Sequence, residues 1–376
     1  MTRLSYIAER LFDGERLHEG AALIVEDGQV VAIGAPEGER IDLGDGVLAP
    51  GMVDLQVNGA GGVAVNGDLT ATRIGTICAT LGRLGATACL PTLITDTPEA
   101  TRAVIAAGID AARDAVPGFL GLHLEGPHLD PRRKGAHDPA LIRQMTEDDV
   151  ADYCDAARAL PALMITLAPA AARPDQIARL HRAGVIVSLG HADCTADEAL
   201  RAQQAGARAV THLFNAMSQM GSRTPGLVGA ALAGDLSCGI IADGVHVDPV
   251  TLRAALAARR HGMFLVSDCM EIAGTGTTEL TLGDRRILRR EGRLTLPDGT
   301  LAGADLTLPR AVGVLVGQVG IAPDRALAMA TAEPARLIGA AGRAGALRPK
   351  MAADMVHLRP DWSPNRVWRA GRELDQ

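Results

Sequence analysis

The chain has 376 residues, of which 47% are hydrophobic and 22% are charged, and this balance excludes a disordered protein. The formal net charge is −7, basic residues form only short pairs such as Arg132-Arg133, and aromatic residues make up 2%, so a nucleic-acid partner is disfavoured. No apolar run reaches the roughly 18 residues of a membrane helix, and the charged N-terminus lacks the apolar stretch of a secretion signal.

The two ends of the chain have the alternation and the turns of short strands. Residues 22–25 and 29–33 flank Asp27-Gly28, which is a strong hairpin signal. At the other end, two strand-like segments, 355–358 and 367–368, flank a turn at Pro360-Asp361. We expect residues 1–49 and 346–376 to pair into one small β-sandwich domain, which the chain leaves and re-enters.

Between these ends, short β-rich runs alternate with helical stretches. Helix starts are marked by Thr97-Pro98, by the capping pair Thr195 and Glu198, and by Asp248-Pro249. There are eight apolar runs: residues 53–57, 86–93, 119–124, 163–167, 185–189, 207–214, 238–242 and 263–267. Nearly continuous apolar strands that alternate with helices indicate a parallel sheet covered on both faces.

Eight such units predict an α/β fold, a (β/α)8 TIM-like barrel that spans residues 50–345. The alternative is an open doubly wound sheet, which is disfavoured because no GxGxxG motif follows an early strand. The six cysteines are scattered singly, without CxxC spacing, which predicts buried thiols and a cytoplasmic location.

Polar side chains follow several of these runs, at the strand ends where barrel enzymes hold their working groups. Glu125, His191 and His212 come at the ends of the third, fifth and sixth runs. One carboxylate and two imidazoles, with a position left open, match the ligand set of a catalytic zinc site. Either histidine alone would more often be a hydrogen-bonded structural residue, but the three ligands together favour a metal site.

Four more polar residues are interpreted one by one. Asp268 ends the eighth run and is either a helix cap or ion-pair partner, or the general base for a water beside the metal. His137 and His246, judged by themselves, are ordinary loop histidines. Arg223 is a solvated loop arginine or, in a barrel enzyme, a clamp for an anion.

Longer motifs extend the pattern over essentially the whole chain. They are PGMVDLQVNG at 50–59, GLHLEGP at 121–127, KGAH at 134–137, SLGH at 188–191, THLFNAM at 211–217, ADGVH at 242–246 and VSD at 266–268. With these motifs the sequence resembles the amidohydrolase superfamily and, within it, the family of N-acetylglucosamine-6-phosphate deacetylases. GLHLEGP and THLFNAM are the most specific of them.

The resemblance implies an enzyme that removes acetate from N-acetylglucosamine 6-phosphate in amino-sugar catabolism. Asp268 would be the acid and base, and His137 would hydrogen-bond the scissile amide oxygen. Glu125, His191 and His212 would bind one divalent metal ion, Zn²⁺ or else Fe²⁺ or Co²⁺. The sugar phosphate would be held by Asn215, the backbone of Ala216, His246, and Arg223, which would reach into the neighbouring subunit of a homodimer.

Two departures from the superfamily pattern stand out. Gln56 and Asn58 occupy the positions of a His-x-His pair that helps to hold a second metal in most amidohydrolases, which suggests one metal here. The segment Cys269-Met270-Glu271 follows Asp268, where a small residue is expected, and this bears on substrate choice. No lysine stands at a strand end for carbamylation, which disfavours dihydroorotase-like or hydantoinase-like activity.

Two other functions stay open. The substrate could be N-acetylgalactosamine 6-phosphate, which differs at one hydroxyl. The protein could also be a non-catalytic sugar-phosphate sensor on the same fold, although Asp268 and the three metal ligands are all present, which speaks against a sensor.

Overall fold

The computed structural model describes residues 3–282 and 285–375, and its centre is an eight-stranded parallel sheet. In sheet order from one edge, the strands are β17 (Met263–Leu265), β16 (Ser237–Ile240), β15 (Ala209–Val210), β14 (Ile186–Leu189), β13 (Leu163–Leu167), β12 (Leu122–Glu125), β11 (Ala88–Ile94) and β8 (Val53–Val57). All residues of β8, β12, β13 and β14 are buried, as expected for strands covered on both faces.

The two edge strands meet through the segment that follows β17. Val57 at the end of β8 forms a parallel bridge with Cys269, and the Asp268 amide donates to the Gln56 carbonyl at 3.0 Å. The sheet is therefore nearly closed into a barrel, and the predicted (β/α)8 fold is confirmed.

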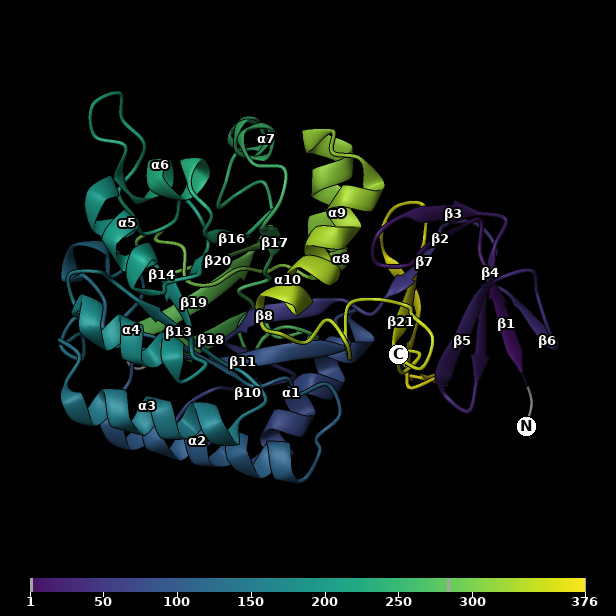
Figure 1. Ribbon diagram of the computed structural model, residues 1–376, viewed down its shortest axis with the longest axis horizontal. Helices are drawn as coiled ribbons and strands as arrows, with labels where there is room; N and C mark the ends of the chain where they lie inside the picture. Colours follow the sequence, from purple (N-terminus) through teal and green to yellow (C-terminus); the bar gives the residue numbers. More distant parts are fainter. Residues whose placement is uncertain (1–2, 283–284, 376) are drawn as a thin grey trace.

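A helix follows each barrel strand in the sequence, and these helices lie around the sheet (Figure 1). These helices are α1 (Ala71–Arg83), α2 (Pro98–Arg113), α3 (Glu147–Ala159), α4 (Pro174–Arg182), α5 (Ala196–Ala205), α6 (Gly226–Ala233), α7 (Pro249–Ala258) and α8 (Leu308–Val314). Three expected helix starts are confirmed, because the side chains of Thr97, Thr195 and Asp248 cap α2, α5 and α7.

Additional helical elements close the barrel where β8 and β17 approach one another. A π-helical segment, η2 (Leu315–Val319), continues α8, and α9 (Pro323–Ala330) and α10 (Ala332–Leu337) follow it. Helix α9 contacts β17, and α10 contacts both β17 and β8. A short 3₁₀ turn, η1 (Pro131–Arg133), and the two-residue strands β9 (Gly59–Ala60) and β10 (Val63–Ala64) lie in the loops after β12 and β8. Among the described residues, none of the helices combines the length and the apolar character needed to cross a membrane.

The two chain ends form two further sheets beside the barrel (Figure 1). One contains β5 (Gln29–Gly34), β4 (Ala22–Glu26), β1 (Leu4–Ile7) and β6 (Glu39–Asp42). The other runs from the C-terminal strands β23 (Arg372–Glu373), β22 (Pro364–Arg369) and β21 (Met355–Leu358) to the N-terminal strands β7 (Val47–Pro50), β2 (Arg10–Phe12) and β3 (Leu17–Glu19).

Buried side chains from both end sheets share one hydrophobic cluster, which is the packing of a sandwich. Tyr6 of β1 meets Trp368 of β22 edge to face, with ring centroids 5.3 Å apart. The Asp27-Gly28 hairpin is confirmed between β4 and β5, with φ of 50° and 76° at the two turn residues. The domain limits at residues 49 and 346 stay a prediction.

A third small sheet was not anticipated from the sequence. It consists of the antiparallel strands β18 (Glu279–Leu282), β19 (Arg285–Arg290) and β20 (Arg293–Thr295), inserted between β17 and α8. Ile287 and Leu294 of this sheet cluster with Met270, which follows β17. The insertion is therefore fixed beside the carboxyl ends of the barrel strands, where we expect the working groups.

Candidate active site

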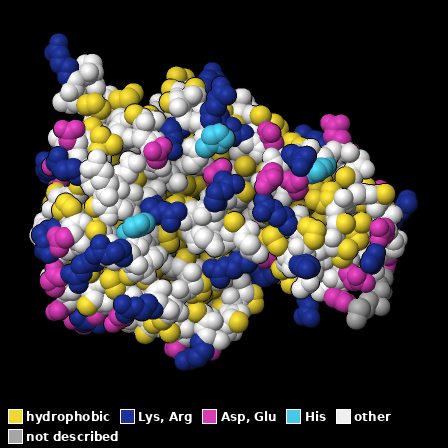
Figure 2. All heavy atoms as spheres, in the orientation of Figure 1, with side chains coloured by type: hydrophobic (Ala, Val, Ile, Leu, Met, Phe, Trp, Pro, Cys, Tyr) yellow, Lys and Arg dark blue, Asp and Glu magenta, His cyan; other side chains and the backbone are white. Residues whose placement is uncertain are grey.

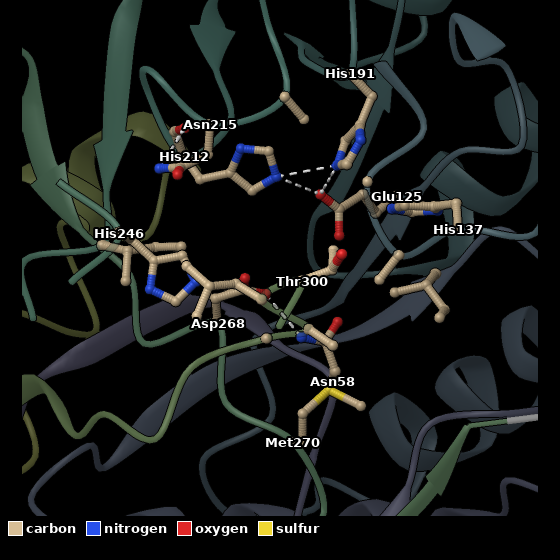
Figure 3. Close-up of a pocket in the computed structure, with 18 of the residues that line it drawn as sticks. Asn58, Glu125, His137, His191, His212, Asn215, His246, Asp268, Met270 and Thr300 are labelled. Carbon is tan, nitrogen blue, oxygen red and sulfur yellow. Dashed lines mark hydrogen bonds and ion pairs between the residues drawn. The ribbon is translucent and has the colours of Figure 1, made fainter. Parts of the chain in front are cut away.

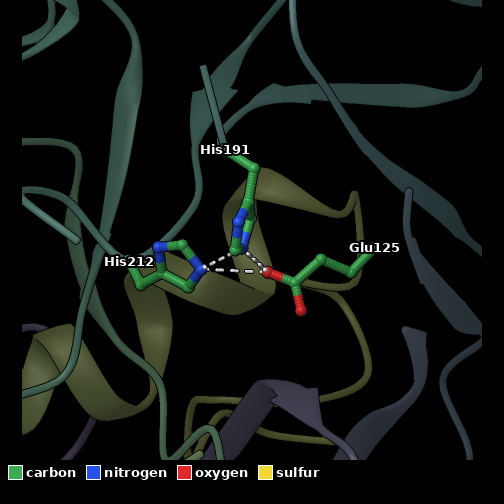
Figure 4. Close-up of side chains that lie close together, drawn as sticks. All are labelled: Glu125, His191 and His212. Atoms are coloured by element: carbon green, nitrogen blue, oxygen red, sulfur yellow. Dashed lines mark hydrogen bonds and ion pairs between the residues drawn. The ribbon is translucent and has the colours of Figure 1, made fainter. Parts of the chain in front are cut away.

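Glu125, His191 and His212 converge at the carboxyl end of the barrel (Figure 4). Glu125 ends β12, while His191 and His212 follow β14 and β15 by two residues each. One Glu125 oxygen, Oε1, lies 3.2 Å from Nε2 of His191 and 2.9 Å from Nε2 of His212, and the two nitrogens are 3.1 Å apart. All three side chains are buried, with 3–6% of their surface exposed.

The hydrogen bonding of His191 shows what this cluster is suited to hold. Its Nδ1 lies 2.8 Å from the Arg133 carbonyl, which can only accept, so Nδ1 carries a proton. When the ring is neutral, its lone pair is therefore on Nε2, which faces the cluster. Two imidazole nitrogens and a carboxylate oxygen, all within 4.8 Å of one another, leave negative charge and lone pairs facing one point. That donor set fits a divalent cation of the zinc type.

The pKa of Glu125 reflects the same crowding. Burial raises it, but the hydrogen bonds with His191 and His212 outweigh burial and hold it well below its usual value. The carboxyl group is therefore ionised and ready to ligate a cation at neutral pH.

Asp268 faces this cluster across a cavity of about 430 Å³ (Figure 3). Its Oδ1 accepts a hydrogen bond of 2.7 Å from Nδ2 of Asn58, which follows β8. Burial, together with the negative charge of Glu125, raises the pKa of Asp268 to about 6. A carboxyl group with a pKa near neutrality can both accept and return a proton.

His137 lines the same cavity beside the cluster. Its Nδ1 accepts a hydrogen bond of 3.2 Å from the backbone amide of Thr95, so the proton of the neutral ring is on Nε2. Burial, and then the nearby His191, lower the pKa of His137 to about 3, which keeps the ring neutral. His137 is therefore a hydrogen-bond donor rather than a base or a cation.

Asn215, Ala216 and His246 also line the cavity. Figure 3 shows Asn215 beside His212, and His246 on the side of the cavity away from His137. Nδ1 of His246 lies 2.6 Å from Oδ2 of Asp243, an arrangement that fixes the ring and turns Nε2 away from that carboxylate. Asn215 and Ala216 belong to the loop that follows His212, and the Asn215 amide donates to the His212 carbonyl at 3.0 Å.

Backbone strain gathers at this site. His191, His212 and Asp268 have φ of 45°, 32° and 51°, and Phe214 and Ala216, in the loop after His212, have φ of 81° and 50°. Left-handed backbone at residues other than glycine costs about 1–3 kcal/mol each and persists only where the surroundings enforce it. The strand ends are thus bent to aim side chains at the cavity.

Gln56 and Asn58 donate to the two carboxylates of the site. Nε2 of Gln56 lies 3.1 Å from Oε1 of Glu125, and Nδ2 of Asn58 holds Asp268. Gln56 belongs to β8 and Asn58 directly follows it. Their side-chain amides orient Glu125 and Asp268, the two acids that the sequence predicted at the site.

Arg223 does not line this cavity. It lies in the exposed loop before α6, which protrudes from the barrel (Figure 1), beside a separate hollow that includes Arg133, Asp193 and Gln219. A role in a neighbouring subunit stays a prediction.

The segment 299–303, which follows β20, also forms part of the cavity wall and was not among the site residues predicted from the sequence. Thr300 of this segment points into the cavity (Figure 3). Gly299 and Gly303 stand at the two ends of the segment, with φ of 88° and 68°. These two glycines were the feature of the sequence that could have pointed to a turn at this place. Met270, flagged as unusual in the sequence, lines the same cavity.

Charged side chains of both signs are spread over the face of the molecule shown in Figure 2. Lysine and arginine side chains are interspersed there with aspartate and glutamate rather than gathered in one patch.

Comparisons with known proteins agree with the geometry. The N-acetylgalactosamine-6-phosphate deacetylase of Shewanella sp. (strain ANA-3) is 38% identical over 336 residues, which cover 89% of this chain and 84% of that protein. The N-acetylglucosamine-6-phosphate deacetylase of Vibrio furnissii is 32% identical over 375 residues, 97% of this chain and 93% of that protein.

A solved structure is also closely similar. It is a mutant N-acetyl-D-glucosamine-6-phosphate deacetylase from Mycobacterium smegmatis in complex with N-acetyl-D-glucosamine-6-phosphate, with a TM-score of 0.91, 29% identity, and coverage of 100% of this chain and 99% of that chain. The model of the amidohydrolase family matches residues 47–374. The chain belongs to the amidohydrolase family, whose members are metal-dependent enzymes.

Proposed function

We propose that the protein hydrolyses the N-acetyl group of N-acetylglucosamine 6-phosphate to give glucosamine 6-phosphate and acetate, as part of amino-sugar catabolism. One observation carries the proposal: a buried Glu125–His191–His212 cluster faces Asp268 across a cavity that His137 also lines. The two relatives and the substrate complex described above support the reaction class and the phosphorylated amino sugar.

The cluster would hold one divalent metal ion, Zn²⁺ or else Fe²⁺ or Co²⁺. Such an ion supplies Lewis-acid polarisation of the amide carbonyl and a lowered pKa for water. Support for a single ion comes from Gln56 and Asn58, because their amide groups are poor metal ligands and donate to carboxylates instead.

The residues of the chain have complementary roles in the reaction. Asp268 would take a proton from the water whose oxygen bonds to the carbonyl carbon, and would deliver it to the nitrogen as the C–N bond breaks. His137, with its proton on Nε2, would donate to the carbonyl oxygen as negative charge develops there. Asn58 would keep the Asp268 carboxylate in place through both proton transfers.

The sugar phosphate would lie at the side of the cavity lined by Asn215, Ala216 and His246. Arg223 of the partner subunit in a homodimer would complete the phosphate site, since Arg223 stands on a protruding loop away from its own cavity. Binding energy from the phosphate, which is remote from the amide, would help to orient the reacting atoms. A cytoplasmic enzyme would meet such a phosphorylated substrate.

A second candidate is the deacetylation of N-acetylgalactosamine 6-phosphate. The observation that favours it is the 38% identity with the Shewanella deacetylase named for that epimer. The two substrates share the amide and the phosphate, so all the roles given above would be unchanged.

Acetate release from each epimer, measured with the metal-loaded protein, tests the proposal. We expect acetate release from N-acetylglucosamine 6-phosphate with a higher kcat/KM than from the galactosamine epimer. Turnover of unphosphorylated N-acetylglucosamine should be much weaker. A clear preference for the galactosamine epimer would establish the second candidate. Binding of either phosphosugar without acetate release would show a sensor.

A further inference from the structure

A chain of buried polar side chains crosses the barrel directly beneath the metal cluster. His123 of β12, Thr166 of β13, Ser188 of β14 and Thr211, which follows β15, are all 0–2% exposed. The layers of a TIM barrel are usually filled by branched aliphatic side chains, so four polar groups at one level need a reason. Their donors and acceptors must also be matched, because an unpaired polar group is costly when buried.

Hydrogen bonds link these groups one after another. Nε2 of His123 lies 2.7 Å from Oγ1 of Thr166, which lies 2.6 Å from Oγ1 of Thr211. The Thr211 oxygen is in turn 2.6 Å from Oγ of Ser188. The contacts join β12, β13, β14 and the end of β15, including one link between strands that are not neighbours in the sheet.

One end of the chain fixes the direction of every bond in it. Nδ1 of His123 faces the Leu55 carbonyl at 3.0 Å, and a carbonyl only accepts, so Nδ1 carries the proton and Nε2 must accept. Thr166 then donates to His123, Thr211 donates to Thr166, and Ser188 donates to Thr211. Every hydroxyl proton is used once, and no second arrangement satisfies the same contacts.

The chain is tied to the three ligand-bearing strand ends. His123 stands two residues before Glu125, Ser188 three before His191, and Thr211 directly before His212. Thr166 is the middle link and pairs in register with both Glu125 and Ser188, although β13 itself provides no ligand.

We propose that the chain His123–Thr166–Thr211–Ser188 is a positioning network that holds the ends of β12, β14 and β15 at the spacing a metal ion requires, with Thr166 as its essential link. This rests on the metal site of the proposed function. Groups that orient metal ligands from outside the ligand shell typically contribute about 10–100-fold to metal affinity. In this network the orientation would pass through the strand backbone, because the four side chains bond to one another.

The test is metal affinity, measured by competition with a chromogenic chelator, in Thr166→Val and Thr166→Ser. Valine keeps the size but removes the hydroxyl, so His123 and Thr211 lose their shared partner, and we expect affinity to fall at least about 10-fold. Serine keeps the hydroxyl and should restore most of the affinity. Ser188→Ala removes only the terminal donor and should give a smaller loss.

Thr331→Val is the matched control. Thr331 is also fully buried, and its hydroxyl donates to the Leu327 carbonyl at 2.7 Å, between α9 and α10. We expect it to lower the melting temperature as Thr166→Val does, without changing metal affinity. Unchanged affinity in Thr166→Val, equal losses in Thr166→Val and Thr331→Val, or no rescue by serine would each overturn the network.

Two outcomes keep this inference apart from the proposed function. Wild-type protein that binds no divalent metal would contradict the metal site itself, whereas metal binding that is insensitive to Thr166 would contradict only the network. Should Thr166→Val fail to fold, Ser188→Ala decides the matter, since metal affinity equal to wild type in that variant would contradict the chain.

Discussion

Replacing Asp268 by asparagine separates its proton chemistry from its place in the structure. Oδ1 of Asp268 accepts from Nδ2 of Asn58 at 2.7 Å, and an amide oxygen in the same position can accept that bond. The side-chain volume and the Asn58 contact therefore survive in Asp268→Asn, while the group that takes and returns a proton is lost.

The expected loss follows from that difference. A positioned general acid or base contributes about 10²–10⁴-fold, which is about 3–5 kcal/mol in the activation free energy. We expect kcat for acetate release to fall by that factor, while bound metal per chain and the melting temperature stay near wild-type values, because the Glu125 cluster does not use the Asp268 carboxylate.

The assay combines kcat, metal content by elemental analysis, and melting on the same preparation. Asn58→Ala is the companion variant, since it keeps the carboxylate but removes its hydrogen-bond donor, and it should lose less activity than Asp268→Asn. Wild-type turnover in Asp268→Asn with full metal would refute the acid–base role. Loss of metal, with activity restored by added metal, would instead make Asp268 a ligand.

Two further predictions concern the phosphate site and a buried acid. Arg223→Ala should lower kcat/KM for the phosphorylated sugar by a factor that corresponds to about 2–4 kcal/mol of lost transition-state stabilisation. Activity on unphosphorylated N-acetylglucosamine should stay nearly unchanged. Equal losses on both substrates would show that Arg223 has a structural role. Burial raises the pKa of Asp54 from 3.8 to about 7, so the folded state binds the Asp54 proton more tightly than the unfolded state does. The stabilisation from the protonated carboxyl group is complete below the unfolded pKa and is lost as pH rises through about 7. Asp54→Asn removes this pH dependence. The free energy of unfolding in urea should therefore fall less between about pH 5 and about pH 8 in the variant than in wild type. An equal fall in both proteins would contradict the raised pKa of Asp54.

The barrel could be predicted because its signals are local. Each apolar run is followed by a helix start or a polar strand end, and residues such as Thr97 and Thr195 cap the helices they announce. Strand limits were less accurate where the backbone turns. The run at 207–214 gives only the two residues of β15, because the chain bends at His212 and Phe214, where φ is positive.

The inserted sheet was missed because its strands are short and have only a weak apolar pattern. Strand β19 reads RRILRR, with little apolar alternation, and its buried Ile287 packs against Met270, which lies outside the sheet. Its effect on the cavity, through Thr300, depends on that packing and could not be read from spacing.

The ligands at the site could be predicted, but their orientation could not. Strand ends brought Glu125, His191 and His212 together because the carboxyl ends of parallel strands share one end of a barrel. The tautomer of His137 depends on the Thr95 amide, 42 residues away in the sequence, and the Gln56 contact with Glu125 spans 69 residues. Such partners depend on the folded packing rather than on any local pattern.

Metal titration during catalysis tests the central claim most directly. Protein stripped by a chelator would receive Zn²⁺ in small steps while acetate release from N-acetylglucosamine 6-phosphate is recorded. With one site at Glu125, His191 and His212, and with the amides of Gln56 and Asn58 directed at carboxylates, activity should rise linearly and level off at one equivalent per chain. Full activity in the stripped protein, or a rise that ends only at two equivalents, would contradict a single-metal deacetylase.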